Sequence, residues 1–176
     1  MFLSHVHPMK GRLQIQQFDR AGHLVTAIEA DNAIVYTGRE LVAKLFIQVD
    51  NIKPISHIAI GTDETPVDPG KDTALGRQVF RKALRPFEQK DLTDNQVDVT
   101  DRDGNPQRQR SSIIRLSADL DFDEPSVKDN GGRPYNLKEA GLFNDAEGGV
   151  MYNRVVFPGI SKTADFKLTL VWEIIF

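Results

Sequence analysis

Apolar and polar residues alternate most regularly at the end of the chain, over residues 165–176. Every second residue there is apolar, in the order Phe166, Leu168, Leu170, Trp172, Ile174 and Phe176. Because successive side chains of a strand point to opposite faces, a period of two indicates a β-strand. We predict a C-terminal strand with Trp172 in the core and with Phe176 ending inside a sheet rather than in a frayed tail.

The same alternation recurs along the chain, with turn signals between the runs. Residues 11–28 predict a β-hairpin whose turn, residues 19–22, has Gly22 where a positive φ is required. Residues 77–87 predict a strand but could instead form a short helix, because their apolar side chains also share a helical face. Further strands are predicted at residues 55–60, 96–100, 111–122, 137–143 and 148–157, the last of them ended by Pro158 and Gly159.

Helical periodicity replaces the alternation in residues 37–48. Thr37 and Glu40 have the spacing of a capping box, in which each side chain caps the backbone amide of the other residue. We expect the apolar face of this helix to pack on the sheet, with partner binding as the alternative. The β-prone residues 33–36 leave the start of the helix open, and residues 73–75 predict a single further helical turn. The apolar face consists of Leu41, Val42, Leu45 and Phe46.

Recurring strands with one clear helix predict a mainly β fold. We expect an antiparallel β-sandwich or barrel-like domain with one amphipathic helix, at about residues 37–48, packed on it. The 176 residues suit a single β-rich domain over residues 1–176 with an N-terminal arm at residues 1–10. A chain of this size buries roughly two thirds of its unfolded surface, so no metal or disulfide is needed to stabilise it.

Charge and cysteine content exclude several classes of protein. The net charge is −3 and the pI is about 5.8, which predicts no bulk attraction to nucleic acid or to anionic membranes. Without cysteine the chain has no disulfide, thiolate zinc site or cysteine nucleophile. No apolar run approaches the ~20 residues of a membrane span, and residues 1–10 lack the apolar region of a signal peptide. We therefore expect a chain made in the cytosol, without membrane insertion.

Two stretches carry residues that could bind a metal, and each has a simpler explanation. His5 and His7 would share one face of a strand, but no third ligand lies nearby in the sequence. The acidic side chains of residues 61–70 could bind a cation, although the two prolines and two glycines of this stretch favour a solvated surface loop. We expect no metal and no cofactor.

Asp119, Asp121 and Asp123 alternate with other residues and look at first like a calcium loop. An EF-hand loop needs glycine at its sixth position and a carboxylate at its twelfth, where this chain has Glu124 and Asn130. Acidic residues on the solvated face of a strand explain the pattern. The alternative is a converging pair of carboxylates, such as Asp119 and Asp121, for glycan hydrolysis.

No arrangement of catalytic residues stands out. The chain has no G-x-S-x-G elbow, Walker loop or G-x-G-x-x-G motif. Ser56 and His57 are adjacent in a predicted strand, so their side chains are expected on opposite faces and unpaired. We predict no catalytic residues and no nucleic-acid partner. The basic residues that gather lack an interleaved aromatic platform for bases, which predicts a solvated face; they are Arg77, Arg81, Lys82, Arg85, Arg108 and Arg110.

A recognisable pattern covers much of the second half of the chain. It reads Glu-Ala-Gly-Leu-Phe-Asn at residues 139–144, Gly-Gly-Val-Met-Tyr-Asn-Arg-Val-Val-Phe at 148–157, Ile-Ser-Lys-Thr at 160–163 and Leu-Thr-Leu-Val-Trp-Glu-Ile at 168–174. Earlier pieces are Gly-Arg-Glu-Leu-Val-Ala at 38–43, Ile-Ala-Ile-Gly-Thr at 58–62 and Asp-Thr-Ala-Leu at 72–75. In this order and spacing they resemble a recurrent module of tailed-bacteriophage structural proteins.

This resemblance implies a structural component of a phage tail or of a related contractile injection particle, acting by symmetric assembly rather than by catalysis. It implies contacts with copies of the same chain and with other tail, baseplate or neck proteins, after assembly in the cytoplasm of the producing cell. It defines no catalytic residues. The alternative is a fibre-like module that binds a carbohydrate receptor, with Tyr135, Tyr152 and Trp172 as candidate stacking residues, although the alternation puts Trp172 in the core.

Overall fold

The computed structural model describes residues 9–176 except residues 50, 101 and 102, so His5 and His7 lie outside the described residues. The described residues form nine strands, one α-helix and two short 3-10 helices. In chain order these are β1 (Lys10–Phe18), β2 (Leu24–Ile34), α1 (Tyr36–Ile47), β3 (His57–Gly61), β4 (Gln78–Ala83), η1 (Gln89–Asp91), β5 (Leu92–Thr100), β6 (Pro106–Leu120), η2 (Val127–Asn130), β7 (Tyr135–Phe143), β8 (Met151–Lys162) and β9 (Lys167–Ile175).

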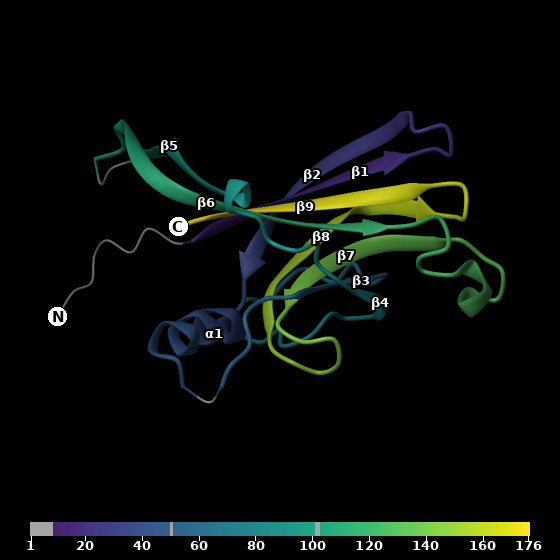
Figure 1. Cartoon of the computed structure of the whole chain (residues 1–176), viewed down its shortest axis with the longest axis horizontal. Helices are drawn as coiled ribbons and strands as arrows, with labels where there is room; N and C mark the ends of the chain where they lie inside the picture. The colour runs from purple at the N-terminus through teal and green to yellow at the C-terminus, as the bar shows by residue number, and fades with distance from the viewer. Residues whose placement is uncertain (1–8, 50, 101–102) are drawn as a thin grey trace.

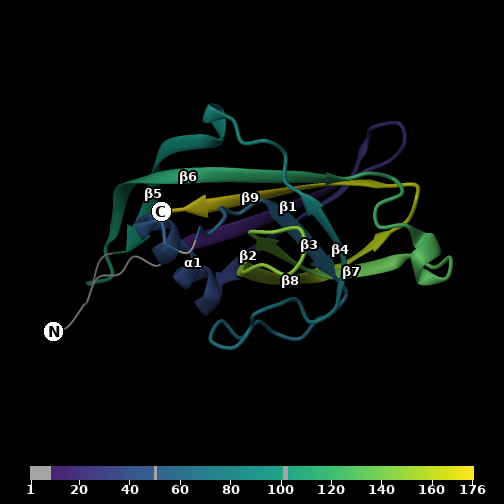
Figure 2. The ribbon, with the colours of Figure 1, turned by 60° about the horizontal axis from the view of Figure 1, so that its bottom comes forward.

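The strands form a continuous antiparallel sheet that curls into two layers (Figures 1 and 2). Its order is β4-β3-β7-β8-β2-β1-β9-β6-β5. Strand β2 connects the two layers, because β8 pairs with it only at Ala33 and Ile34 while β1 pairs with it over most of its length. On the other side, the Arg85 backbone N–H just after β4 donates to the Ser117 carbonyl of β6 at 2.8 Å. The predicted mainly β fold with one helix is confirmed.

Strand β9 is central to its layer, with β1 on one side and β6 on the other. Its residues alternate between half-buried and buried, and Trp172 is fully buried. The prediction of a C-terminal strand with Trp172 in the core is therefore confirmed. The prediction for the last residue is wrong, because Phe176 lies beyond the core and is 49% exposed, although its backbone N–H still donates to the Ser112 carbonyl.

The predicted capping box of α1 is wrong. The helix begins one residue earlier, after Val35, and it has no side-chain cap. Thr37 instead donates its hydroxyl hydrogen to the Met151 carbonyl of β8 at 2.9 Å. Gly38 lies so close to β8 that a Cβ there would be 1.9 Å from the Tyr152 carbonyl oxygen.

This close approach sets which face of α1 is buried. Leu41 is buried as predicted, whereas Phe46 is 90% exposed, contrary to the prediction that it packs on the sheet. Because Gly38 and Leu41 face β8, Phe46 and Ile47 are turned toward solvent.

Two further local predictions differ from the structure. Residues 73–75 form no helical turn. Pro158 and Gly159 do not end β8, which continues to Lys162, because a bulge sets three residues of β8 opposite Lys138 of β7. The alternative of a helix at residues 77–87 is also wrong, since β4 pairs with β3 there.

Candidate functional site

The most constrained polar cluster lies on β7 and β8, within the motifs that suggested the phage resemblance. Glu139 of β7 is fully buried and Arg154 of β8 is 2% exposed. The Nε atom of Arg154 donates to Oε2 of Glu139 at 2.9 Å. A buried charge is tolerated only when paired, so each of these residues requires the other.

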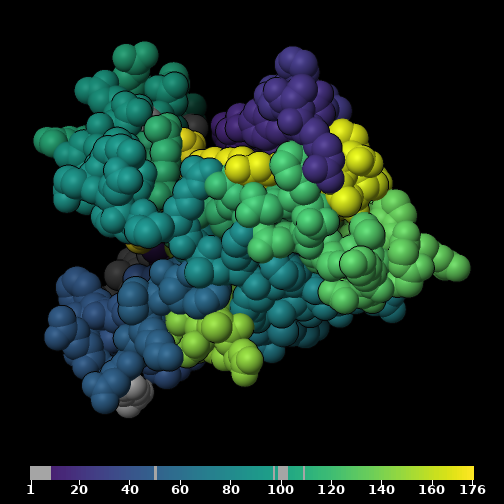
Figure 3. Space-filling view, turned by 45° about the vertical axis from the view of Figure 1, so that its right-hand side comes forward, coloured from purple at the N-terminus to yellow at the C-terminus, as the bar shows by residue number. Residues whose placement is uncertain are grey.

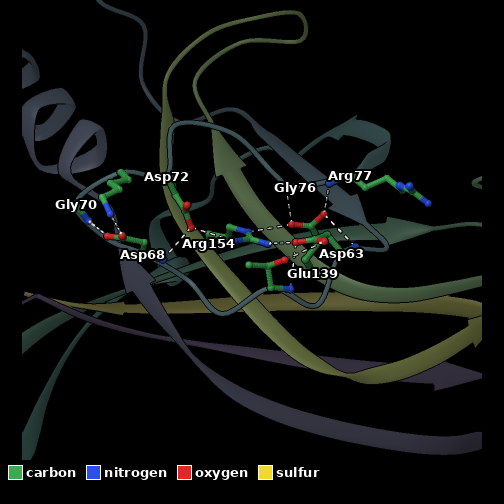
Figure 4. Close-up of polar contacts among 10 residues, drawn as sticks. Asp63, Asp68, Gly70, Asp72, Gly76, Arg77, Glu139 and Arg154 are labelled. Atoms are coloured by element: carbon green, nitrogen blue, oxygen red, sulfur yellow. Dashed lines mark hydrogen bonds and ion pairs between the residues drawn. The ribbon is translucent and has the colours of Figure 1, made fainter.

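Two aspartates from the loop between β3 and β4 complete the cluster (Figure 4). Nη1 of Arg154 donates to Asp72 and Nη2 donates to Asp63, each at 2.9 Å. We call these four residues, Asp63, Asp72, Glu139 and Arg154, the Arg154 network. Its members are far apart in the sequence, and it fixes the loop onto the sheet.

Backbone N–H groups balance the excess of three carboxylates over one guanidinium. Glu139 accepts from the Arg77 amide at 2.7 Å and from the Gly76 amide at 3.0 Å. Asp63 accepts from the Thr65 amide at 3.1 Å. Gly76 itself leaves room for the network, since a Cβ there would be 2.3 Å from an oxygen of Asp63.

These contacts stabilise the charged forms of Arg154 and Asp63. Burial disfavours the Arg154 cation, but hydrogen bonds to Asp72 and Glu139 outweigh this and raise the pKa of Arg154. The pKa of Asp63 is lowered, chiefly by the hydrogen bond from the Thr65 hydroxyl and further by Arg154. Arg154 and Asp63 are therefore held in their charged forms by their partners within the network.

Other polar residues of the same motifs also serve the backbone. The side-chain oxygen of Asn144 accepts from the Val150 amide at 2.6 Å, and its nitrogen donates to the Lys53 carbonyl at 3.2 Å. Asn153 is fully buried, and its oxygen accepts from the Leu142 amide at 3.0 Å. These hydrogen bonds hold the turn after β7 and the β7–β8 pair in place.

Lys162, from the Ile-Ser-Lys motif, is also fully buried. Its Nζ atom donates to the carbonyls of Phe122 and Thr163, each at 2.9 Å. Burial lowers the pKa of Lys162 to about 8, against the opposing influence of nearby acidic side chains.

The prediction that Ser56 and His57 cannot pair is wrong. Ser56 lies just before β3, outside the alternation, and its hydroxyl is 2.8 Å from Nδ1 of His57. Among the described residues no carboxylate hydrogen-bonds the other nitrogen of His57, because Asp145 bonds Lys53 at 2.6 Å instead. The pair therefore lacks the third group that would orient a catalytic base.

Four of the six basic residues form ion pairs, and three of these, Arg85, Arg108 and Arg110, keep more than half of their side chain exposed, as expected for a solvated face. Arg81 is half-buried, with its guanidinium 3.8 Å from the centroid of the Phe143 ring. Lys82 pairs with Glu124, Arg85 with Asp119, Arg108 with Asp98 and Arg110 with Asp94. Arg77 and Arg81 make no ion pair within the part of the chain that the structure describes, although Arg81 donates to the carbonyls of Asp145 and Gly148.

Of the acidic residues considered for calcium binding or glycan hydrolysis, Asp119 forms an ion pair with Arg85 and Asp121 forms one with Lys82. Burial opposes the charged form of Asp119, but hydrogen bonds from Arg85 and Thr169 outweigh it and keep the pKa of Asp119 low. A general acid would need a raised pKa. Across residues 9–176, apart from residues 50, 101 and 102, no cluster of three or more His, Asp or Glu residues could hold a metal.

The aromatic residues considered for carbohydrate stacking are buried. Tyr135, Tyr152 and Trp172 are 8%, 1% and 0% exposed. The stacking platform expected for the carbohydrate-binding alternative is therefore absent from these three positions.

No protein-family model, curated protein or solved structure matches this chain. Among the described residues, no helix is both long enough and apolar enough to cross a membrane.

Proposed function

We propose that this chain is a structural assembly component of a phage tail or a related contractile injection particle, which acts by binding copies of itself and neighbouring tail, baseplate or neck proteins. The proposal starts from the motif resemblance at residues 139–174. It is supported by the role of the motif's polar residues, each of which hydrogen-bonds a backbone group or pairs with an opposite charge. These residues are Glu139, Asn144, Asn153, Arg154 and Lys162. Such residues preserve a rigid scaffold rather than catalyse a reaction.

The observation that carries the proposal is the exposed apolar surface of α1 and the residues around it. Phe46 is 90% exposed, and Tyr36, Ile47 and Val49 are also exposed. Monomeric soluble proteins rarely expose large apolar side chains in such a group, which more often mark protein–protein contacts. Figure 3 shows α1 and the β5–β6 hairpin as two projections from the body of the molecule.

Free sheet edges add a second kind of contact surface. Residues 24–32 of β2 have no strand partner on the side away from β1, within the described residues. In the part of the chain that the structure describes, β5 is the outermost strand of its layer and pairs only with β6. Unpaired backbone groups at such edges can accept a strand from a neighbouring chain.

Light scattering coupled to size-exclusion chromatography tests the role of α1. We expect the purified chain to form a defined oligomer and the double variant Phe46→Ser, Ile47→Ser to shift toward the monomer. The matched control is Phe87→Ser, which removes an aromatic side chain that is 53% exposed but lies outside α1.

A monomeric wild-type chain at high concentration, together with its absence from purified particles by mass spectrometry, would overturn the assembly role. An oligomer that survives the double variant would instead show that α1 is not the contact surface.

A further inference from the structure

An open cavity lies between the ends of β3 and β4, the start of β7 and η2. Its volume is about 280 Å³. This volume suits one sugar ring rather than a larger cofactor, because sites for drug-sized ligands occupy roughly 300–1,000 Å³. The polar residues that line it are Thr62, Arg77, Asn130, Tyr135, Asn136 and Lys138.

The lining carries positive charge although the whole chain is acidic. Arg77 and Lys138 line the cavity, and no Asp or Glu does. Lys138 forms an ion pair with Glu64, whereas Arg77 forms none among the described residues. The cavity therefore offers one uncompensated guanidinium, the side chain best suited to bind a carboxylate through two parallel hydrogen bonds.

The Arg154 network holds Arg77 in place. The backbone N–H of Arg77 donates to Glu139 at 2.7 Å, and Figure 4 shows the Arg77 side chain pointing away from the network. The network thus fixes the backbone of Arg77, while the Arg77 guanidinium does not pair with the carboxylates of the network.

Tyr135 supplies a second unpaired group. Its side chain is 8% exposed and lines the cavity, yet its hydroxyl has no hydrogen-bond partner among the described residues. A hydroxyl that borders a cavity and makes no hydrogen bond to the protein is a donor and acceptor available to a ligand. Asn136 and Thr62 add neutral hydrogen-bonding groups at the same cavity.

We propose that this cavity binds an acidic monosaccharide unit, with its carboxylate on Arg77 and its ring hydroxyls on Tyr135 and Asn136. One cation beside several neutral hydrogen-bonding groups matches one carboxylate on a polyhydroxylated ring. The buried Tyr135 ring cannot stack on the sugar, so affinity comes from hydrogen bonds and one charge pair. The inference does not depend on the assembly role.

Titration of the full-length chain with glucuronate, followed by NMR chemical-shift changes, tests the proposal. We expect saturable binding of glucuronate and at least about tenfold weaker binding of glucose, because removing a charged hydrogen-bond partner costs on the order of 1.5–3 kcal/mol. Acetate should bind more weakly than glucuronate, since it lacks the ring hydroxyls.

Two variants assign the contacts. Arg77→Ala should reduce glucuronate affinity at least about tenfold, whereas Arg133→Ala, which changes an exposed arginine outside the cavity lining, should leave it unchanged. Tyr135→Phe keeps the ring and removes only the hydroxyl, so it should weaken binding severalfold while the protein stays folded.

Equal binding of glucose and glucuronate, full binding by Arg77→Ala, or no binding of glucuronate would overturn the proposal. The oligomeric state of Arg77→Ala should match that of the wild type, so failure of this site and failure of the assembly role remain distinguishable.

Discussion

Charged groups around Arg154 are buried and paired, whereas α1 leaves large apolar side chains in solvent. Arg154 is 2% exposed and contacts three carboxylates, while Phe46 is 90% exposed. Both features oppose the usual distribution of residues, in which charges are exposed and aromatic residues are buried. The charges around Arg154 therefore find their partners within this chain, whereas Phe46 and Ile47 of α1 stay largely exposed to solvent.

The projecting β5–β6 hairpin extends the comparison. Among the described residues, β6 has no strand partner other than β5 over residues 106–111, because its pairing with β9 ends where Ile113 lies opposite Ile175. A two-stranded ribbon contributes little stability by itself. We therefore expect the hairpin to tolerate changes that the central strands do not.

The largest effect is expected from removing residues 171–176. This truncation deletes buried Trp172 and Ile174 and their pairing with both β1 and β6. The loss is at least about 5 kcal/mol, comparable to the whole stability of a domain, so the truncated chain should not fold. Circular dichroism and urea titration provide the measurement.

The matched control is a shortened β5–β6 hairpin, in which a two-residue turn replaces residues 97–108. We expect this variant to remain folded. If the truncated chain unfolds cooperatively with an unchanged midpoint, β9 is not the centre of the core.

The next largest effect is expected for Arg154→Met. It leaves fully buried Glu139 without its cation and releases Asp63 and Asp72, at a cost of about 3–5 kcal/mol. The denaturation midpoint should fall accordingly. Arg108→Met, which breaks an exposed ion pair with Asp98 on the hairpin, should cost at most about 1 kcal/mol. Similar losses of stability in the two variants would show that the buried Arg154 network stabilises the fold no more than the exposed pair of Arg108 and Asp98.

A smaller effect is expected from pH. The pKa of Lys162 is about 8 in the folded chain, against 10.5 as its ordinary value. Between these values the unfolded chain binds the proton more strongly, so the free energy of unfolding should rise with pH, by about 1–2 kcal/mol between pH 7.5 and 9.5. Tyr152, with its pKa raised to about 12, acts in the opposite sense above pH 10.

Urea titrations across this range should show the rise in wild type and a flatter profile in Lys162→Met. A variant with the same slope as wild type would assign the pH dependence to other groups.

Alternation along the sequence was sufficient to predict the strands and the burial of Trp172, because a period of two depends only on neighbouring residues. It could not predict the Arg154 network, whose aspartates lie 82 and 91 residues from Arg154. The loop at residues 61–70 was therefore expected to be solvated, although its Asp63 contacts the buried guanidinium of Arg154.

The errors at α1 and Ser56 have the same origin. The face that α1 buries depends on the contact between Gly38 and the Tyr152 carbonyl, which helical periodicity does not contain. Ser56 pairs with His57 because the strand begins only at His57, and a boundary error of one residue changes where a side chain points. The sequence places Arg77 in a run of basic residues. Only the folded structure shows that Arg77 lines a cavity while other residues of that run form ion pairs.

The pairing of β1 with β9 constrains the order of events during synthesis. Lys10 lies opposite Ile175, so β1 can pair with β9 only after β9 has been synthesised. Strand β6 also pairs with β9 and depends on its synthesis in the same way. Folding of this layer on the ribosome is therefore delayed until β9 emerges, and its dominance by distant contacts predicts slow folding with a period in which strand edges are open to aggregation.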